Sequence, residues 1–215
     1  MIADLPAPFL QGAYQYRNAS AAITVLGTLN RSSPVNYTNI AVGLQNVRLA
    51  GRFQVISGEP AVVVLDVAHN PDAAEALAIN LREARHSGST YAVFGIMKDK
   101  DIGAVVGAVQ DLVDTWSVGR IENERGASTN QMRQELKAKD VSTKDIIRFP
   151  SVSAAYRHAI AAARCHDRIV VFGSFHTVAA VLREIGRPAL WLSSGMDEPH
   201  QGHSIQTRRE TPATF

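Results

Sequence analysis

The chain is poor in several features that would each specify a class of protein. It has one cysteine, Cys165, among 215 residues, so an internal disulfide is excluded and a reducing, cytoplasmic compartment is favoured. The formal net charge is only +2 with no basic block, which argues against nucleic acid as a partner. No apolar run approaches the roughly 18 residues of a membrane helix, and the first residues lack the pattern of a signal peptide. We therefore expect no membrane association.

Short motifs of common enzyme sites are also absent. The sequence has no G-x-G-x-x-G for a dinucleotide, no G-x-x-x-x-G-K-[ST] for a phosphate-cradling loop and no His/Cys spacing typical of zinc. A serine hydrolase that pairs Ser174 with His176 or His69 is a third-ranked alternative. The sequence around Ser174 lacks the G-x-S-x-G turn of such enzymes.

What the chain does contain is a strand–loop–helix unit around which the rest is organised. The run at 62–65 is continuously apolar, which is typical of a strand buried on both faces of a parallel sheet. It ends at Asp66, and His69 follows in a short loop. Asn70 and Pro71 then form a helix start, because asparagine caps a helix and proline suits its first turn. Asp66 and His69 are thereby placed beside a helix N-terminus, where anions bind.

Strand and helix patterns alternate from residue 61 onward. The expected strands are 62–65, 91–96, 115–118, 146–149 and 168–172, with a helix after each and a further edge strand at 189–192. This alternation predicts an α/β fold with a mostly parallel, doubly wound, Rossmann-like sheet covered by helices. We assign this domain to 61–192 and expect a mobile tail at 193–215, which is polar and has no periodicity.

The first fifty residues have a different pattern. Two amphipathic helices are expected at 18–29 and 35–47, with no strand beside them. We interpret 1–50 as the helical remnant of another domain and 51–60 as a linker. The apolar faces of these helices should pack on the sheet domain, pair with a second copy of the chain, or leave the helices poorly ordered.

Polar side chains follow four of the predicted strands. These groups are Asp66 and His69, then Asp99 and Lys100, then Arg125, and finally Ser174 and His176. Each alone has a structural explanation, such as a helix cap, a solvated turn or a surface cation. Because the carboxyl ends of parallel strands meet at one edge, together they indicate a site for a polar, charged ligand.

Three of these segments resemble a known family. L-D-V-A-H-N-P at 65–71, G-I-M-K-D-K-D at 95–101 and G-S-F-H-T-V at 173–178 are similar to the C-terminal domain of the bifunctional dihydrofolate synthase/folylpolyglutamate synthases, in the Mur ligase superfamily. The segment 12–19 resembles the family's G-x-H-Q-x-x-N-A, with Tyr14 where histidine is common. G-R-F-Q at 51–54 resembles the interdomain linker.

The resemblance implies an ATP-dependent ligase. ATP would phosphorylate the carboxylate of dihydropteroate or folate, and the amine of L-glutamate would displace phosphate from the acyl phosphate, with Mg²⁺ supporting phosphoryl transfer. It also implies residue roles. Asn18, Arg52 and Asp66 would contact ATP, and His69 with Asp66 would be catalytic. The implied substrate-binding residues are His69, Ser174, His176, Arg125 and Lys100.

The resemblance makes residues 1–50 a helical remnant of the family's central ATPase domain, and the phosphate loop of that domain has no match in these 215 residues. We therefore expect this chain to be inactive alone, with Mg²⁺ bound mostly by the missing domain. The family is usually monomeric, but self-association through 1–50 is expected here. The alternative function is a stand-alone module that binds glutamate or a nucleotide.

Overall fold

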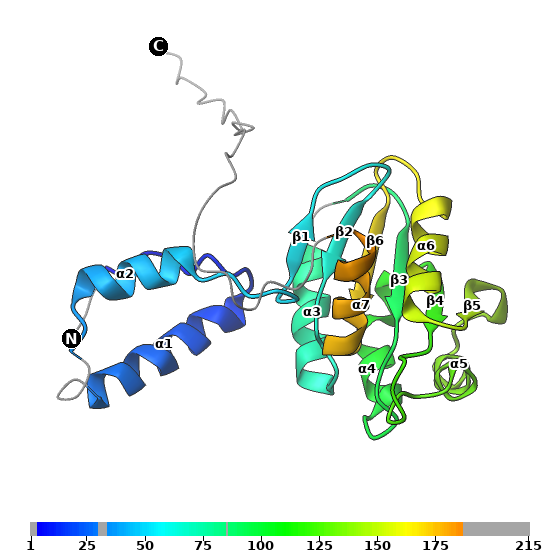
Figure 1. The fold of residues 1–215 in the computed structure, drawn as a ribbon, viewed down its shortest axis with the longest axis horizontal. Coiled ribbons are helices and arrows are strands. Elements are labelled where there is room, and N and C mark those ends of the chain that lie inside the picture. The colour runs from blue at the N-terminus through cyan, green and yellow to red at the C-terminus, as the bar shows by residue number, and fades with distance from the viewer. Residues whose placement is uncertain (1–3, 30–33, 85, 187–215) are drawn as a thin grey trace, which may run out of the picture.

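Figure 1 shows the fold in the computed structural model, which describes residues 4–29, 34–84 and 86–186. Six strands form one sheet: β1 (Gln54–Ile56), β2 (Val62–Leu65), β3 (Thr90–Phe94), β4 (Thr115–Gly119), β5 (Ile146–Phe149) and β6 (Arg168–Phe172). The helices are α1 (Ala13–Thr28), α2 (Tyr37–Asn46), α3 (Pro71–Glu83), α4 (Ile102–Val109), α5 (Thr129–Ala138), α6 (Val152–Ala162) and α7 (Phe175–Glu184). Within these ranges, no helix is long and apolar enough to span a membrane.

The strand order β1-β2-β6-β3-β4-β5 explains how the helices are distributed. Strands β2 to β5 succeed one another across the sheet, except that β6 returns to lie between β2 and β3, and these five strands are parallel. Parallel crossovers are right-handed, so a reversal of direction moves the connecting helix to the other face. Accordingly α3, α4 and α5 cover one face, and α6 and α7 cover the other.

A cluster of three aromatic rings fills the core under α3 and α4. Phe94 lies with its ring centre 4.9 Å from that of Phe172 and 5.7 Å from that of Trp116, and all three side chains are fully buried. The rings come from three adjacent strands, and their tilted and edge-on contacts are the geometries that aromatic pairs favour. This packing fixes β3, β4 and β6 relative to one another.

The predicted α/β sheet is confirmed, and the strands after 61 lie within one or two residues of their expected places. One strand was missed. β1 lies inside the predicted linker 51–60 and pairs antiparallel with β2. Its three residues are too few to give an alternating pattern. Val62 was expected to be buried but is 40% exposed, because β1 ends opposite Val63. The edge strand at 189–192 and the tail at 193–215 lie outside the described residues.

The two N-terminal helices are formed and project from the sheet domain (Figure 1). α1 begins five residues before the expected residue 18, since Gly12 adopts a positive φ of 107° immediately before it. Val25 and Val42 on these helices are 55% and 52% exposed, so the sheet domain covers their apolar faces only in part. Self-association through 1–50 and the assigned domain boundaries stay predictions.

A buried arginine joins α3 to the edge of the sheet at which the parallel strands begin. Arg168 begins β6 and is 4% exposed. Its Nη1 donates to the carbonyl oxygens of Leu81 at 2.8 Å and Ala84 at 3.3 Å, and its Nη2 donates to Thr90 Oγ1 at 3.1 Å. The carbonyls at a helix C-terminus have no partner within the helix, so this guanidinium satisfies two groups that folding would otherwise leave unpaired.

Candidate functional site

The carboxyl ends of β2, β6 and β3 are joined by hydrogen bonds beyond the strands themselves. The Asp66 amide donates to Val171 O at 2.9 Å, which ties the loop after β2 to β6. On the other side of β6, Thr177 Oγ1 on α7 donates to Gly95 O at 2.6 Å. The loops that carry Asp66, Gly95 and Ser174 therefore meet at one rim, as expected for the edge where α/β proteins bind ligands.

Asp66 is held by backbone amides at this rim. Its Oδ2 accepts the N–H of Phe53 at 2.9 Å and its Oδ1 accepts the N–H of Ala68 at 2.8 Å, and the residue is 5% exposed. Burial raises the pKa of Asp66 from its usual 3.8 to about 6, against the two amide bonds and the nearby Arg52, which lower it. Both carboxylate oxygens thus already have partners within the chain.

This raised pKa predicts a pH-dependent stability. The folded state binds the proton of Asp66 more tightly than the unfolded state. The contribution of this proton to the free energy of unfolding is therefore complete below about pH 4 and is lost as pH rises through 6. A shift of this size corresponds to about 3 kcal/mol. We expect the free energy of unfolding of the wild type, measured in urea by circular dichroism, to fall by that amount relative to Asp66→Asn between pH 4 and 7. A difference between the two proteins that is flat with pH would contradict this.

His69 is half-buried, and its ring is oriented by a backbone contact. Its Nδ1 lies 2.8 Å from Val67 O, and a carbonyl can only accept, so Nδ1 carries the hydrogen. In the neutral ring, Nε2 is then the nitrogen with a free lone pair. The ring centre lies 6.2 Å from that of Phe175, the first residue of α7. His69 is therefore brought next to the segment that carries Ser174.

Ser174 is the N-cap of α7. Its Oγ accepts the amide of His176 at 3.2 Å, and Ser174 is 5% exposed whereas His176 is exposed. The preceding Gly173 has a φ of 108°, and a Cβ there would lie 2.5 Å from Gly95 O. The strand thus turns into α7 through a conformation and a close approach that only glycine allows.

Lys100 and Arg125 lie together at the carboxyl ends of β3 and β4. Asp99 binds both, with Lys100 Nζ and Arg125 Nη2 each 3.4 Å from a carboxylate oxygen. The Lys98 amide donates to Arg125 O at 2.8 Å, which holds the two loops against each other. Both predicted cations thus lie on loops of the same sheet edge, and the single charge of Asp99 offsets one of their two positive charges.

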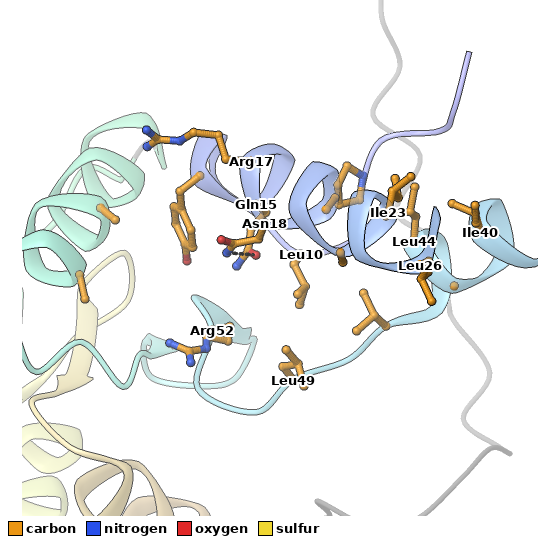
Figure 2. Close-up of a pocket in the computed structure, with 18 of the residues that line it drawn as sticks. Leu10, Gln15, Arg17, Asn18, Ile23, Leu26, Ile40, Leu44, Leu49 and Arg52 are labelled. Atoms are coloured by element: carbon orange, nitrogen blue, oxygen red, sulfur yellow. Dashed lines mark hydrogen bonds between the residues drawn. The ribbon is translucent and has the colours of Figure 1, made fainter. Parts of the chain in front are cut away.

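A pocket of about 760 Å³ lies between α1, α2, the linker and α3 (Figure 2). Its polar end is formed by Gln15 and Asn18 on α1, which point towards Arg52 on the linker, and by Arg17, which extends from α1 towards α3. Asn18 Nδ2 donates to Gln15 Oε1 at 3.1 Å. The apolar end is lined by Leu10, Ile23, Leu26, Ile40, Leu44 and Leu49. Such a pocket suits a ligand with a flat apolar part and a polar or charged part.

Three of the residues predicted from the sequence line this pocket, namely Asn18, Arg52 and Asp66. The other five, His69, Ser174, His176, Lys100 and Arg125, belong to the rim outside its lining. Sequence reasoning gave no role to Gln15 and Arg17, which precede the motif asparagine Asn18 in the segment 12–19. It also missed Asp72, an exposed carboxylate in the first turn of α3.

The described ranges contain no group of three His, Cys, Asp or Glu side chains that could hold a metal ion. That the missing domain holds most of the Mg²⁺ ligands stays a prediction.

Comparison with known proteins identifies the family. The family described as "Mur ligase, glutamate ligase domain" matches residues 51–175. The chain is 38% identical over 165 residues to the dihydrofolate synthase/folylpolyglutamate synthase of Escherichia coli, which covers 76% of this chain and 37% of that protein. The corresponding Buchnera protein from Acyrthosiphon pisum is 35% identical over 164 residues, 76% of this chain and 38% of its own.

Solved structures agree with this assignment. E. coli FolC in complex with DHPP and ADP superposes with a TM-score of 0.71 and 34% identity, over 86% of this chain and 41% of that one. A bifunctional folylpolyglutamate synthase/dihydrofolate synthase with Mn, AMPPNP and L-glutamate bound gives 0.71 and 35%, over 86% and 42%. The chain spans about two-fifths of the length of these relatives, and it belongs to the Mur ligase family through its glutamate ligase domain.

Proposed function

We propose that this chain is the glutamate-ligase part of an ATP-dependent carboxylate–amine ligase that joins L-glutamate to dihydropteroate or folate. One observation carries the proposal: the polar end of the pocket, with Asn18 and Arg52, adjoins the sheet rim through the shared residue Asp66. A nucleotide in the pocket would therefore have its phosphates near the rim, and helix N-termini such as that of α3 favour anions. The substrates are those of the relatives, some of whose structures contain DHPP, ADP or L-glutamate.

The chemistry assigns a role to His69. The terminal phosphoryl group of ATP passes to a carboxylate oxygen of the folate substrate, which leaves ADP and an acyl phosphate. The glutamate amine must lose a proton before its lone pair can attack the carbonyl carbon. Nε2 of His69 accepts that proton. The new C–N bond forms as the C–O bond to phosphate breaks, and phosphate leaves with the electron pair. The departing phosphate takes up the second proton, which the nitrogen loses on becoming an amide.

Polar and charged groups at two ends complete the proposed site. Arg52 and the N-terminus of α3 would face the phosphates, while Ser174, His176, Lys100 and Arg125 would lie towards the glutamate end. Mg²⁺ would neutralise charge on the phosphates, and most of its ligands would come from the family's central ATPase domain.

The decisive experiment is a chimera, because this chain spans 37% of its E. coli relative. Residues 51–186 of this chain replace the matching domain of that relative, and ADP release dependent on both dihydropteroate and L-glutamate is measured. We expect turnover, and we expect His69→Ala to lower kcat at least about 100-fold because a positioned general base contributes that much. Arg164→Met, on an exposed side chain, is the matched control. A folded chimera without glutamate-dependent turnover would overturn the proposal.

The isolated chain distinguishes this function from a binding module. We expect no ATP-dependent ligation by the 215 residues alone. When L-glutamate or ADP is titrated into them in a calorimeter, we expect no binding with a dissociation constant in the micromolar range. Micromolar binding by the isolated chain would favour the stand-alone module instead.

A further inference from the structure

We propose that Asp66 is a positioning residue for Arg52: its carboxylate latches the linker turn at 51–53 onto the loop after β2, so that Arg52 faces the pocket. The position of Arg52 and the latch stand on the geometry of this chain alone. The consequence for ATP rests on the proposed function.

The linker turn is a conformation that needs to be held. Gly51 has a φ of 69° and Phe53 a φ of 46°, so two of three successive residues adopt the left-handed region. That region is disfavoured for a bulky side chain such as Phe53, and residues in it persist where surrounding contacts impose them. The Phe53 ring is 4% exposed and packs in the core under α3, which anchors one end of the turn.

Asp66 supplies the polar part of this restraint. Its Oδ2 accepts the Phe53 amide at 2.9 Å, and its Oδ1 accepts the amide of Ala68 at 2.8 Å. One carboxylate therefore bridges the linker and the loop after β2. The reverse contact, from the Val67 amide to Gly51 O at 2.8 Å, closes the turn from its other end.

Arg52 is the residue between these two attachments. With the backbone held on both sides, its side chain leaves the turn towards the pocket, where it faces the polar end formed by α1 (Figure 2). Its guanidinium carbon lies 5.8 Å from the centre of the Phe175 ring, within the range of a cation–π contact. The latch thus places a cation between the pocket and the start of α7.

The carboxylate itself has little capacity left for a ligand. It is 5% exposed and both oxygens accept amides. Two titratable groups on other segments face it, Arg52 on the linker and Tyr14 on α1. Protonation would put a hydrogen on one of two oxygens that each face an N–H, so the latch should weaken as Asp66 is protonated, with a pKa of about 6.

The first test needs no ligand. In ¹⁵N-labelled chain we expect the amide signal of Phe53 to titrate with a midpoint near pH 6. We expect the hydrogen exchange of this amide at pH 7 to be at least about tenfold faster in Asp66→Asn, because the side chain of asparagine has an NH₂ donor in place of one of the two accepting carboxylate oxygens. The exchange of Ala92, buried in β3, should not change, which shows that the fold persists. Asp72→Asn is the matched control, because it removes another carboxylate that lines the pocket, whereas the Phe53 amide donates to Asp66. Unchanged protection of Phe53 in folded Asp66→Asn would overturn the latch.

The second test separates positioning from direct contact with ATP. In the chimera, Asp66→Asn and Arg52→Gln should each raise KM for ATP about tenfold. The KM of the double variant should be no higher than the higher of the two single-variant values. Multiplied effects would mean that Asp66 acts on ATP independently of Arg52, which would overturn the positioning role. If the chimera has no activity while the Phe53 amide behaves as expected, the proposed function fails and the latch stands.

Discussion

Replacement of Gly173 by alanine should lower the free energy of unfolding by about 3 kcal/mol. The residue ends β6 with a φ of 108°, and an added Cβ would lie 2.5 Å from Gly95 O and 2.9 Å from Phe94 Cε2. A strained backbone conformation and overpacking of a core each cost about 1–3 kcal/mol. The neighbour at 2.5 Å is backbone of the adjacent strand, which cannot turn aside as a flexible side chain can. Urea unfolding at constant pH measures the loss.

Gly107→Ala is the matched control for this substitution. Gly107 lies inside α4 with ordinary helical geometry, and a Cβ there would meet only Lys139 side-chain atoms at 3.6 Å or more. Alanine should therefore stabilise the same domain by about 0.5–1 kcal/mol. If Gly173→Ala were as stable as the wild type, the close approach of β6 and β3 at the rim would be wrong.

Replacement of Arg168 by methionine should cost about 3 kcal/mol at the other end of the same strand. Methionine fills much of the volume but donates no hydrogen bond, so Leu81 O and Ala84 O lose their side-chain donor. An unsatisfied buried acceptor costs about 1–3 kcal/mol. Burial already lowers the pKa of Arg168, and removal of that desolvated charge offsets part of the loss.

The control for Arg168 is Arg164→Met, which removes the same charge from an exposed position just before β6. Its effect should stay within about 0.5 kcal/mol, as for most surface substitutions. Thermal and urea unfolding of both variants give the comparison. Equal stability of the two would show that the guanidinium does not hold α3 to the sheet.

Much of the local structure could be predicted from residue types alone. Asn70 was expected at a helix start, and its side chain accepts the amide of Ala73 at 2.9 Å. Asp101, Ser128 and Ser151 each accept the amide three residues later in the same way, at 2.9–3.1 Å. These contacts are local, so they depend on short sequence spacing and not on the rest of the fold. The buried strands were equally evident, because continuous apolar runs leave few alternatives.

The site was only partly accessible in this way. His69 and Ser174 were expected near each other because strand ends meet at one edge. The partner Phe53 of Asp66 could not be identified from the sequence, since it lies 13 residues away, just before a strand too short to recognise. Arg17 was missed because an exposed arginine on a helix looks the same whether or not a pocket opens beside it.

The sequence by itself determined the alternation of strands and helices, the polar ends of the strands and the helix caps, all of which arise from interactions between residues close along the chain. Only the tertiary structure decided that β6 enters between β2 and β3, that β1 closes the edge beside β2, and that α1 stands over α3 to form the pocket. The reason is that strand order and helix docking depend on the simultaneous burial of many side chains far apart in sequence. No single segment carries that information.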